Sequence, residues 1–504
     1  MNRIKFKIIA IMIILSLSSC QKDPPPVQKP IGEYAGAKEA IAAVDALYHT
    51  GAPTFYGERS LSDVPVAAIG GYLSGFFETE SGFESKLYDD CRLLSFDGMA
   101  GYAGEVWKQA YDAIGISNKV IENIALTPGL SSGQIGNLEA EARFFRAFNY
   151  FYLARAFGDI PLVTQGVLGG NAVKFKLSQI YESIINDLNR AIAVLPDEGF
   201  TGNNFRIGRP AAQTLLADVY LTISGYPQQQ NYYKQAAETA RQIIEGKRHA
   251  LILNGLTPET SAYNLLRTQS DNRESVYSYK PREGGASRSL SALSLSKDAG
   301  EWGVVKIQTV NAYSPTQSLL DIYESGEDMR IEEQQLFHSF VKYEKNERTV
   351  IQTFSRLPYL WFDRKTLFGS GASQKNITIY RYAEVLLIAA EAIAMSEGVT
   401  SEAAGYLADV RSRAYQNIDR ETIVGRLMGL SADKFVQQVW IERLREFPLE
   451  MKIWPDIQRT RKYPVATPNI DDKVTFQDVI GSTNPSNITF EERHLLLPYS
   501  YNNN

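Results

Sequence analysis

Few residues of the kinds that build metal centres or disulfide frameworks occur in this chain of 504 residues, which holds two cysteines and four histidines. Cys20 follows an export signal, so we expect no pairing with Cys91, which we interpret as a buried or half-buried thiol. The histidines lack the spacing of paired metal ligands: His49, His249, His338 and His494. We therefore expect no metal site.

Nucleotide-binding signatures are absent as well. No glycine-rich loop ends in Lys-Ser or Lys-Thr, and no dinucleotide fingerprint follows an expected strand. The formal net charge is −5 and the pI is about 5.7, so the charge balance gives no sign of nucleic-acid binding. We expect no cofactor and no nucleic-acid partner.

The amino terminus predicts export and membrane anchoring. Basic residues in Met1–Lys7 precede a short apolar run, Ile8–Leu17, which is typical of a secretory signal and too short for a membrane span. Leu17–Cys20 (LSSC) resembles a bacterial lipobox, in which the cysteine becomes the lipidated first residue. We therefore expect a signal peptide at 1–19 and a lipid anchor with a proline-stiffened tether at 20–32. The alternative is an ordinary signal peptide with a coincidental Cys20.

Helical periodicity defines most of the mature chain. We expect a helical scaffold at about 33–50, 104–246 and 379–464, and a loop-rich lobe at about 51–103 and 248–375. Within the scaffold, helices begin near Leu177 and Pro210, about 33 residues apart, which is close to the tetratricopeptide helix-pair period. In the lobe we expect short strands at Glu274–Tyr279 and Thr349–Phe354, followed by an aromatic group at Tyr359, Trp361 and Phe362. The predicted fold is mostly α, with tetratricopeptide-like helix pairs packed against a loop-rich lobe that has few strands.

Ile379–Ala394 (IYRYAEVLLIAAEAIA) predicts a buried helix because apolar residues occupy nearly every face. Its carboxylates, Glu384 and Glu391, share one face. We expect them to pair with Arg411 and Arg413 on the next helix.

Two motifs invite a catalytic interpretation. Glu442 and Glu446 lie one turn apart, as a glycosidase pair might, but interleaved arginines lower carboxylate pKa values and favour a structural ion-pair network. Ser131 lies in a G-x-S-x-G spacing that follows a helix and a proline instead of a strand, so we interpret it as part of an inter-helix turn.

Several longer segments together resemble the SusD/RagB lipoproteins. The segments are Glu141–Val163 (EARFFRAFNYFYLARAFGDIPLV), Ile379–Ala392, Leu407–Ala414 (LADVRSRA) and Trp440–Pro464 (WIERLREFPLEMKIWPDIQRTRKYP), with weaker similarity at Val106–Ile124 and Pro315–Arg330. The resemblance implies a lipid-anchored outer-membrane protein that faces the cell exterior. It also implies capture of a glycan, or of a peptide, for a SusC-like TonB-dependent barrel, with no catalytic activity.

The same resemblance implies ligand contacts on loops of the lobe and of the early insert. Sugar faces stack on aromatic rings beside polar groups. The ligand-binding candidates are Trp302, Tyr88, Phe96 and Tyr102, with Asp97 and Glu301 as polar contacts. Trp302 is the foremost candidate because the residues around it in sequence offer little core. The alternatives are a surface glycoside hydrolase that uses acidic residues of the lobe, and a purely structural tetratricopeptide scaffold.

Overall fold

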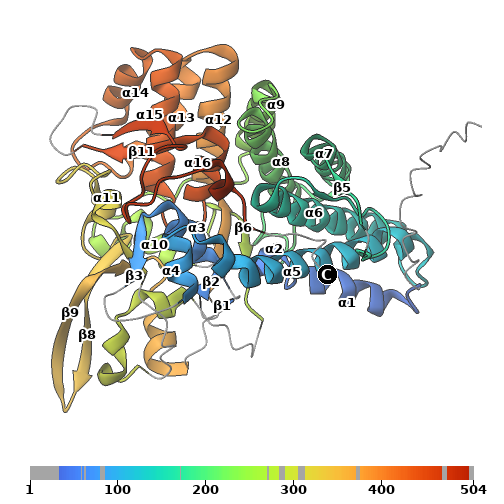
Figure 1. Ribbon diagram of the computed structural model, residues 1–504, viewed down its shortest axis with the longest axis horizontal. Coiled ribbons are helices and arrows are strands. Elements are labelled where there is room, and N and C mark those ends of the chain that lie inside the picture. The colour runs from blue at the N-terminus through green and yellow to red at the C-terminus, as the bar shows by residue number, and fades with distance from the viewer. Residues whose placement is uncertain are drawn as a thin grey trace, which may run out of the picture.

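The computed structural model describes residues 33–57, 60–61, 64–79, 86–170, 172–269, 272–282, 290–304, 313–370, 375–467 and 474–498. Helices dominate these residues, and the strands among them form short antiparallel pairs (Figure 1). The mostly α class predicted from the sequence is therefore confirmed. The expected signal peptide, Cys20 and the tether lie outside the described residues.

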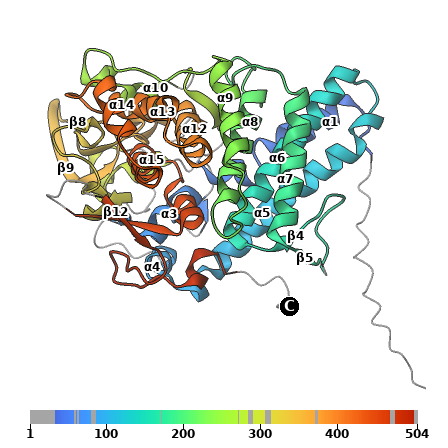
Figure 2. The same ribbon diagram turned by 90° about the horizontal axis from the view of Figure 1, so that it is seen from above.

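The scaffold is a row of helices in which each packs against the next in the chain. α5 packs on α6, α6 on α7, α7 on α8 and α8 on α9 (Figure 2). Their bounds are Phe96–Asn123 for α5, Ser132–Phe157 for α6, Leu177–Val194 for α7, Arg209–Ser224 for α8 and Tyr233–Glu245 for α9. α1 (Ala37–Leu47) covers α5 and α6. Stacking of successive antiparallel helices is the packing expected of tetratricopeptide-like pairs.

The row continues after a long insertion. α12 (Tyr382–Glu397) packs against α9, although the lobe separates the two helices in sequence. α13 (Ser401–Ser412) and α15 (Ala432–Glu446) then pack on α12. α14 (Arg420–Met428) and α16 (Ile453–Thr460), which the sequence did not reveal, complete this part of the scaffold (Figure 1).

The inserted lobe contains short elements and one long hairpin. The hairpin of β8 and β9 extends away from the helices in Figure 1. Their bounds, with those of the other lobe elements, are α10 Ala262–Thr268, β6 Ser275–Tyr279, β7 Tyr313–Pro315, α11 Gln317–Leu320, β8 Phe337–Lys345, β9 Arg348–Pro358 and β10 Ile377–Arg381. The strands expected at Glu274–Tyr279 and Thr349–Phe354 are confirmed as β6 and as part of β9.

The early insert is more regular than its composition indicates. It forms α2 (Ala52–Phe55), α3 (Val66–Ser74), β3 (Phe77–Thr79) and α4 (Lys86–Arg92), with a small β1–β2 pair at Ser60–Leu61 and Val64–Pro65. β3 pairs with β7, which joins the early insert to the later lobe. Two further strand pairs lie outside the lobe: β4 Ile160–Pro161 with β5 Lys174–Phe175, and β11 Lys462–Ala466 with β12 Val474–Asp478.

Helix α6 begins earlier than predicted because Ser131 caps it. The Gln134 amide donates to the Ser131 hydroxyl at 3.4 Å, and the Ser131 amide donates to the Gln134 side chain at 3.0 Å. This reciprocal capping box satisfies two amides that the first helical turn leaves free. The interpretation of Ser131 as part of an inter-helix turn is confirmed, with the helix starting directly at Ser132.

Helix α12 is buried as predicted, but the expected partners of its carboxylates are wrong. The first residues of the predicted helix, Ile379 to Arg381, belong to β10, which pairs with β6. Glu391 pairs with Arg459 of α16 at 2.6 Å, and Glu384 pairs with Lys452 at 2.8 Å. Arg411 and Arg413 point to other carboxylates, because α12 packs its acidic face toward α15 and α16.

Glu442 and Glu446 belong to a buried ion-pair network, as the interleaved arginines predicted. Arg330 lies 2.7 Å from Glu442 and 2.9 Å from Glu446, and Arg411 pairs with Glu442 at 2.8 Å. Burial alone would raise the pKa of Glu446, but Arg381, Arg413 and Arg330 outweigh burial and hold the pKa far below its usual value. A carboxyl group held ionised in this way is unsuited to act as a general acid.

Candidate ligand-binding site

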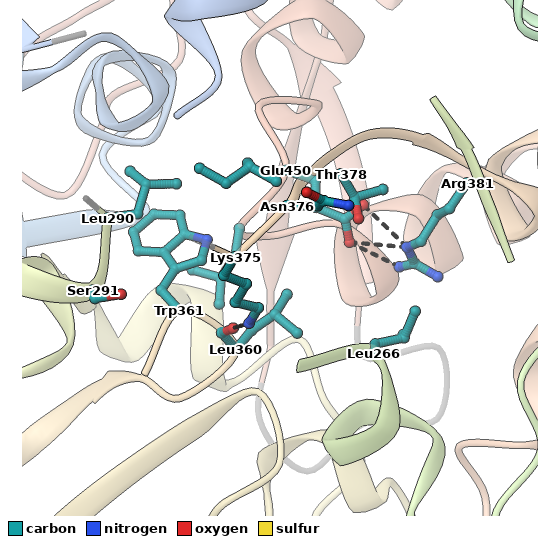
Figure 3. Close-up of a pocket in the computed structure, with 12 residues that line it drawn as sticks. Leu266, Leu290, Ser291, Leu360, Trp361, Lys375, Asn376, Thr378, Arg381 and Glu450 are labelled. Atoms are coloured by element: carbon teal, nitrogen blue, oxygen red, sulfur yellow. Dashed lines mark hydrogen bonds and ion pairs between the residues drawn. The ribbon is translucent and has the colours of Figure 1, made fainter. Parts of the chain in front are cut away.

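A pocket of about 600 Å³ lies where the lobe meets the scaffold (Figure 3). We call it the Trp361 pocket. Its described lining comes from α10, from the start of a 3-10 turn at Leu290–Ser294 and from the segment that follows β9. The rest comes from β10 with the two residues before it, and from the segment that follows α15. The lining residues are Leu266, Leu290, Ser291, Leu360, Trp361, Lys375, Asn376, Ile377, Thr378, Arg381, Leu449 and Glu450.

Trp361 supplies the aromatic surface of this pocket. The residue is 7% exposed, and its ring stacks on Tyr313 with centroids 5.4 Å apart. Tyr313 lies in β7 and is itself buried. The indole is therefore held rigidly in place, which lowers the entropy cost of binding against it.

The scaffold side of the pocket is an arginine–glutamate pair. Arg381 Nε lies 3.0 Å from both carboxylate oxygens of Glu450, and Arg381 Nη1 lies 2.8 Å from Glu274 and 2.6 Å from Glu446. Arg413 joins the same two carboxylates, Glu274 and Glu446, at 2.6 Å each. This side of the pocket therefore belongs to the buried charge network described above.

Lys375 lines the pocket, and its amine lies beside the Leu360 carbonyl (Figure 3). Its Nζ donates to the Leu360 carbonyl at 2.7 Å. Burial, with a further contribution from the nearby Arg267, lowers the pKa of Lys375 to about 7. The amine is a hydrogen-bond donor whether it is protonated or neutral.

The polar groups of the pocket include amide, amine, hydroxyl, guanidinium and carboxylate side chains. Glu450 is the only carboxylate among the described lining residues. Burial raises the pKa of Glu450, although Arg381 opposes the rise. Hydrolysis of a glycosidic bond ordinarily uses two carboxyl groups across the bond, whereas an indole beside amide, amine and hydroxyl groups is a surface for binding.

The foremost predicted contact, Trp302, lies elsewhere. It is 6% exposed and belongs to a separate hydrophobic cluster of the lobe with Val341, Tyr343 and Leu367. Its ring stacks on Phe354 with centroids 5.8 Å apart. The expectation that Trp302 has little core around it is therefore wrong, because the hairpin of β8 and β9 folds over it. Its neighbour Glu301 is exposed.

The other candidates gather near α4 and the start of α5. Tyr88 is buried, and its hydroxyl accepts the Thr79 amide at 3.0 Å. Phe96, Asp97 and Tyr102 lie on α5, which begins at Phe96 and not at Gly104 as predicted. None of the six candidates lines the Trp361 pocket. A role of these residues in ligand contact stays a prediction.

Trp361 and Lys375 were missed by the sequence-based selection. Trp361 stands in the aromatic group that follows β9, and Lys375 stands just before β10. One sequence feature could have led to these two residues. Both stand at the end of the lobe, shortly before the chain enters the scaffold again. What the sequence did not reveal is which of the three rings in that group faces a cavity.

Comparison with known proteins identifies the family of this chain. A family model described as "Starch-binding associating with outer membrane" matches residues 68–221, and the SusD family model matches residues 345–502. The two matched segments together make up more than half of the chain. The chain belongs to the SusD/RagB family. The resemblance found in the sequence motifs is confirmed.

Individual members of the SusD/RagB family match over most of their length. SusD-like protein P2 of Formosa agariphila is 25% identical over 475 residues, which cover 91% of each chain. A SusD superfamily protein of Parabacteroides distasonis superimposes with a TM-score of 0.78 at 25% identity, covering 92% of this chain and 95% of that one. Surface glycan-binding protein A of Bacteroides fluxus shares the fold, with a TM-score of 0.66, 18% identity and coverage of 92% and 95%.

SusD/RagB proteins are associated with the outer membrane. Within the described ranges, this chain has no helix with the length and apolar character that a membrane crossing requires. Within the same ranges, no group of three or more His, Cys, Asp and Glu side chains is arranged to hold a metal ion.

Proposed function

We propose that this protein is a non-catalytic lipoprotein of the cell surface that captures a glycan in the Trp361 pocket. The proposal rests on one observation above all, that Trp361 lines one cavity together with Lys375, Asn376 and Ser291. An apolar sugar face stacks on an aromatic ring while the sugar hydroxyls bond to neighbouring donors and acceptors.

The glycan is then delivered to a SusC-like TonB-dependent barrel in the outer membrane. Support comes from membership of a family described as starch-binding and associated with the outer membrane, and from a structural relative named as a surface glycan-binding protein. The anchor in this proposal is lipidated Cys20, with the protein on the extracellular side. A peptide is the alternative ligand.

Isothermal titration calorimetry with a panel of oligosaccharides tests the binding step. Trp361→Ala is expected to weaken the affinity for the cognate glycan tenfold or more, because truncating an aromatic anchor costs about 1.4 kcal/mol or more. Trp361→Phe, which keeps a ring, is expected to retain part of the affinity. Trp107→Phe serves as the matched control, since Trp107 is similarly buried but lies outside the pocket.

Two results would overturn the proposal. Unchanged glycan affinity in Trp361→Ala, with an unchanged melting temperature, would remove the pocket from the function. Sustained release of shorter sugars from the glycan would favour the hydrolase alternative. The transport step is tested separately by co-purification from membranes, where absence of a barrel partner would count against delivery to a transporter.

A further inference from the structure

A second pocket shares no lining residue with the Trp361 pocket. We call it the Phe96 pocket. Its walls come from α3, the start of α5, the end of α6, α16 and the segment at 494–497. α3 and α16 lie side by side here (Figure 1).

The lining of the Phe96 pocket is aromatic and aliphatic, with a single permanent charge. Rings come from Tyr56, Phe96, Tyr102, Tyr152 and Trp454, and aliphatic surface comes from Val66, Ile69, Leu73, Met99, Leu496 and Leu497. No aspartate or glutamate occurs among the described lining residues. Arg155 is the charged residue of this lining, and the carboxylate of Asp218 in α8, which does not line the pocket, offsets part of its charge.

Arg155 has no carboxylate partner within ion-pair distance in the described chain. Its Nε donates to the Phe151 carbonyl at 3.4 Å, and its guanidinium carbon lies 3.9 Å from the centroid of the Phe151 ring. Arg155 stands in the last turn of α6, where the helix carbonyls favour a positive charge. These contacts leave the terminal guanidinium nitrogens available, and such nitrogens bind carboxylates in a bidentate manner.

His494 supplies a second donor to the same pocket. The Glu491 amide donates to His494 Nδ1 at 2.9 Å, so the ring hydrogen belongs to Nε2. Burial, with a contribution from Arg493, lowers the pKa of His494, which keeps the ring neutral at physiological pH. The ring stacks on Phe96 with centroids 5.3 Å apart. Phe96 is therefore positioned as one aromatic wall of the cavity.

We infer that the Phe96 pocket is a second ligand site, which binds a small aromatic monocarboxylate. The ring of this ligand lies among Phe96, Tyr102 and Trp454. The carboxylate of the ligand pairs with Arg155 and accepts a hydrogen bond from His494. This site goes beyond the proposed glycan capture and does not depend on it. It also gives two of the sequence-predicted ligand residues, Phe96 and Tyr102, a ligand of a different chemical class.

Titration of the purified protein with trans-cinnamate and with cinnamamide tests this inference. The two probes have the same shape and differ in charge, so the wild-type protein is expected to bind cinnamate at least about tenfold more tightly than the amide. Calorimetry gives both affinities. Equal affinity for the two probes, or no binding of cinnamate, would overturn the inference.

Variants locate the carboxylate contact. Arg155→Met is expected to reduce the affinity for cinnamate to that for cinnamamide, and Arg155→Lys is expected to restore part of the difference. Arg209→Met is the matched control, because Arg209 is also half-buried and also donates to a backbone carbonyl, that of Ile192 at 3.2 Å. A loss of cinnamate affinity in Arg209→Met as large as in Arg155→Met would refute the assignment.

Two further measurements keep the result independent of folding and of the glycan site. If Arg155→Met does not fold, the comparison of acid with amide on the wild-type protein decides the question. Trp361→Ala is expected to leave cinnamate affinity unchanged. A loss of cinnamate binding in Trp361→Ala would place the probe in the Trp361 pocket and overturn the inference.

Discussion

Replacement of Glu391 by alanine is expected to destabilise the fold without changing ligand affinity. Glu391 accepts two hydrogen bonds from Arg459, at 2.6 and 2.8 Å, and one from the Trp440 indole at 2.9 Å. The Glu391 and Arg459 side chains are 2% and 5% exposed. The carboxylate thus joins α12 to α15 and α16 in a place that water does not reach.

The loss of stability depends on the charge of Arg459, which the substitution leaves buried without Glu391. Removing one partner of a buried ion pair costs about 3–5 kcal/mol, because the other partner stays buried and uncompensated. Arg459 would keep one carboxylate, Asp456 at 2.7 Å, so we expect about 3 kcal/mol. Total stabilities of folded domains are about 5–15 kcal/mol, so this loss is large.

Urea unfolding measures the loss, and a surface pair on the same helix provides the control. Glu397 of α12 binds Arg241 at 2.7 and 2.9 Å, but its side chain is 39% exposed. Exposed pairs contribute about 0–1 kcal/mol, so Glu397→Ala is expected to cost about that much. Equal losses in Glu391→Ala and Glu397→Ala would refute the reasoning, as would a loss of glycan affinity with unchanged stability. The double variant Glu391→Leu with Arg459→Leu is expected to regain much of the stability lost in Glu391→Ala.

Three further predictions concern other parts of the chain. Because Lys375 has a pKa of about 7 in the folded protein and an ordinary value of 10.5, the unfolded state binds more protons between these values, and stability rises with pH across that window. Lys375→Met removes this contribution, so the stability advantage of the variant in urea unfolding should shrink by about 2 kcal/mol from pH 7 to pH 9, and a constant difference would contradict the assignment. Trp302→Ala should cost about 3–5 kcal/mol in urea unfolding through lost packing on Phe354 and Tyr343, whereas a loss below about 1 kcal/mol would contradict the buried position. Cys20→Ser should move the protein from the membrane fraction to the soluble fraction, and an unchanged distribution would contradict the lipid anchor.

The helical scaffold was the part of the fold most accessible from the sequence. The periodic stretch of α7 predicts a helix because it buries one stripe of apolar residues, whereas α6 and α8 are buried on nearly every face. Short elements were missed where contacts with distant parts of the chain determine the secondary structure. The first residues of the Ile379 segment form β10 because β6 lies beside them, and no local pattern reveals that pairing.

The partners of buried charges and the ligand site were less accessible. The sequence indicated that Glu384 and Glu391 must be neutralised, but the choice of Lys452 and Arg459 over Arg411 and Arg413 depends on how α12, α15 and α16 pack. The polar surroundings of Trp302 in sequence suggested an exposed ring, whereas its actual neighbours come from β8 and β9. Trp361 has apolar neighbours in sequence and nevertheless lines a cavity.

Arg381 belongs both to the Trp361 pocket and to the buried charge network. This double role limits how the ligand specificity of such a protein can change. Substitutions of Arg381 or Glu450 alter ligand contacts and global stability together, so a new specificity is not readily acquired through them. Lys375, Asn376 and Ser291 lie outside the described ion pairs of Arg381. Diversification of the ligand among relatives is therefore expected to proceed along the lobe side of the cavity, while the scaffold side stays constant. Directed evolution of binding to a new sugar, with Arg381 and Glu450 left free to vary, would recover substitutions on the lobe side alone.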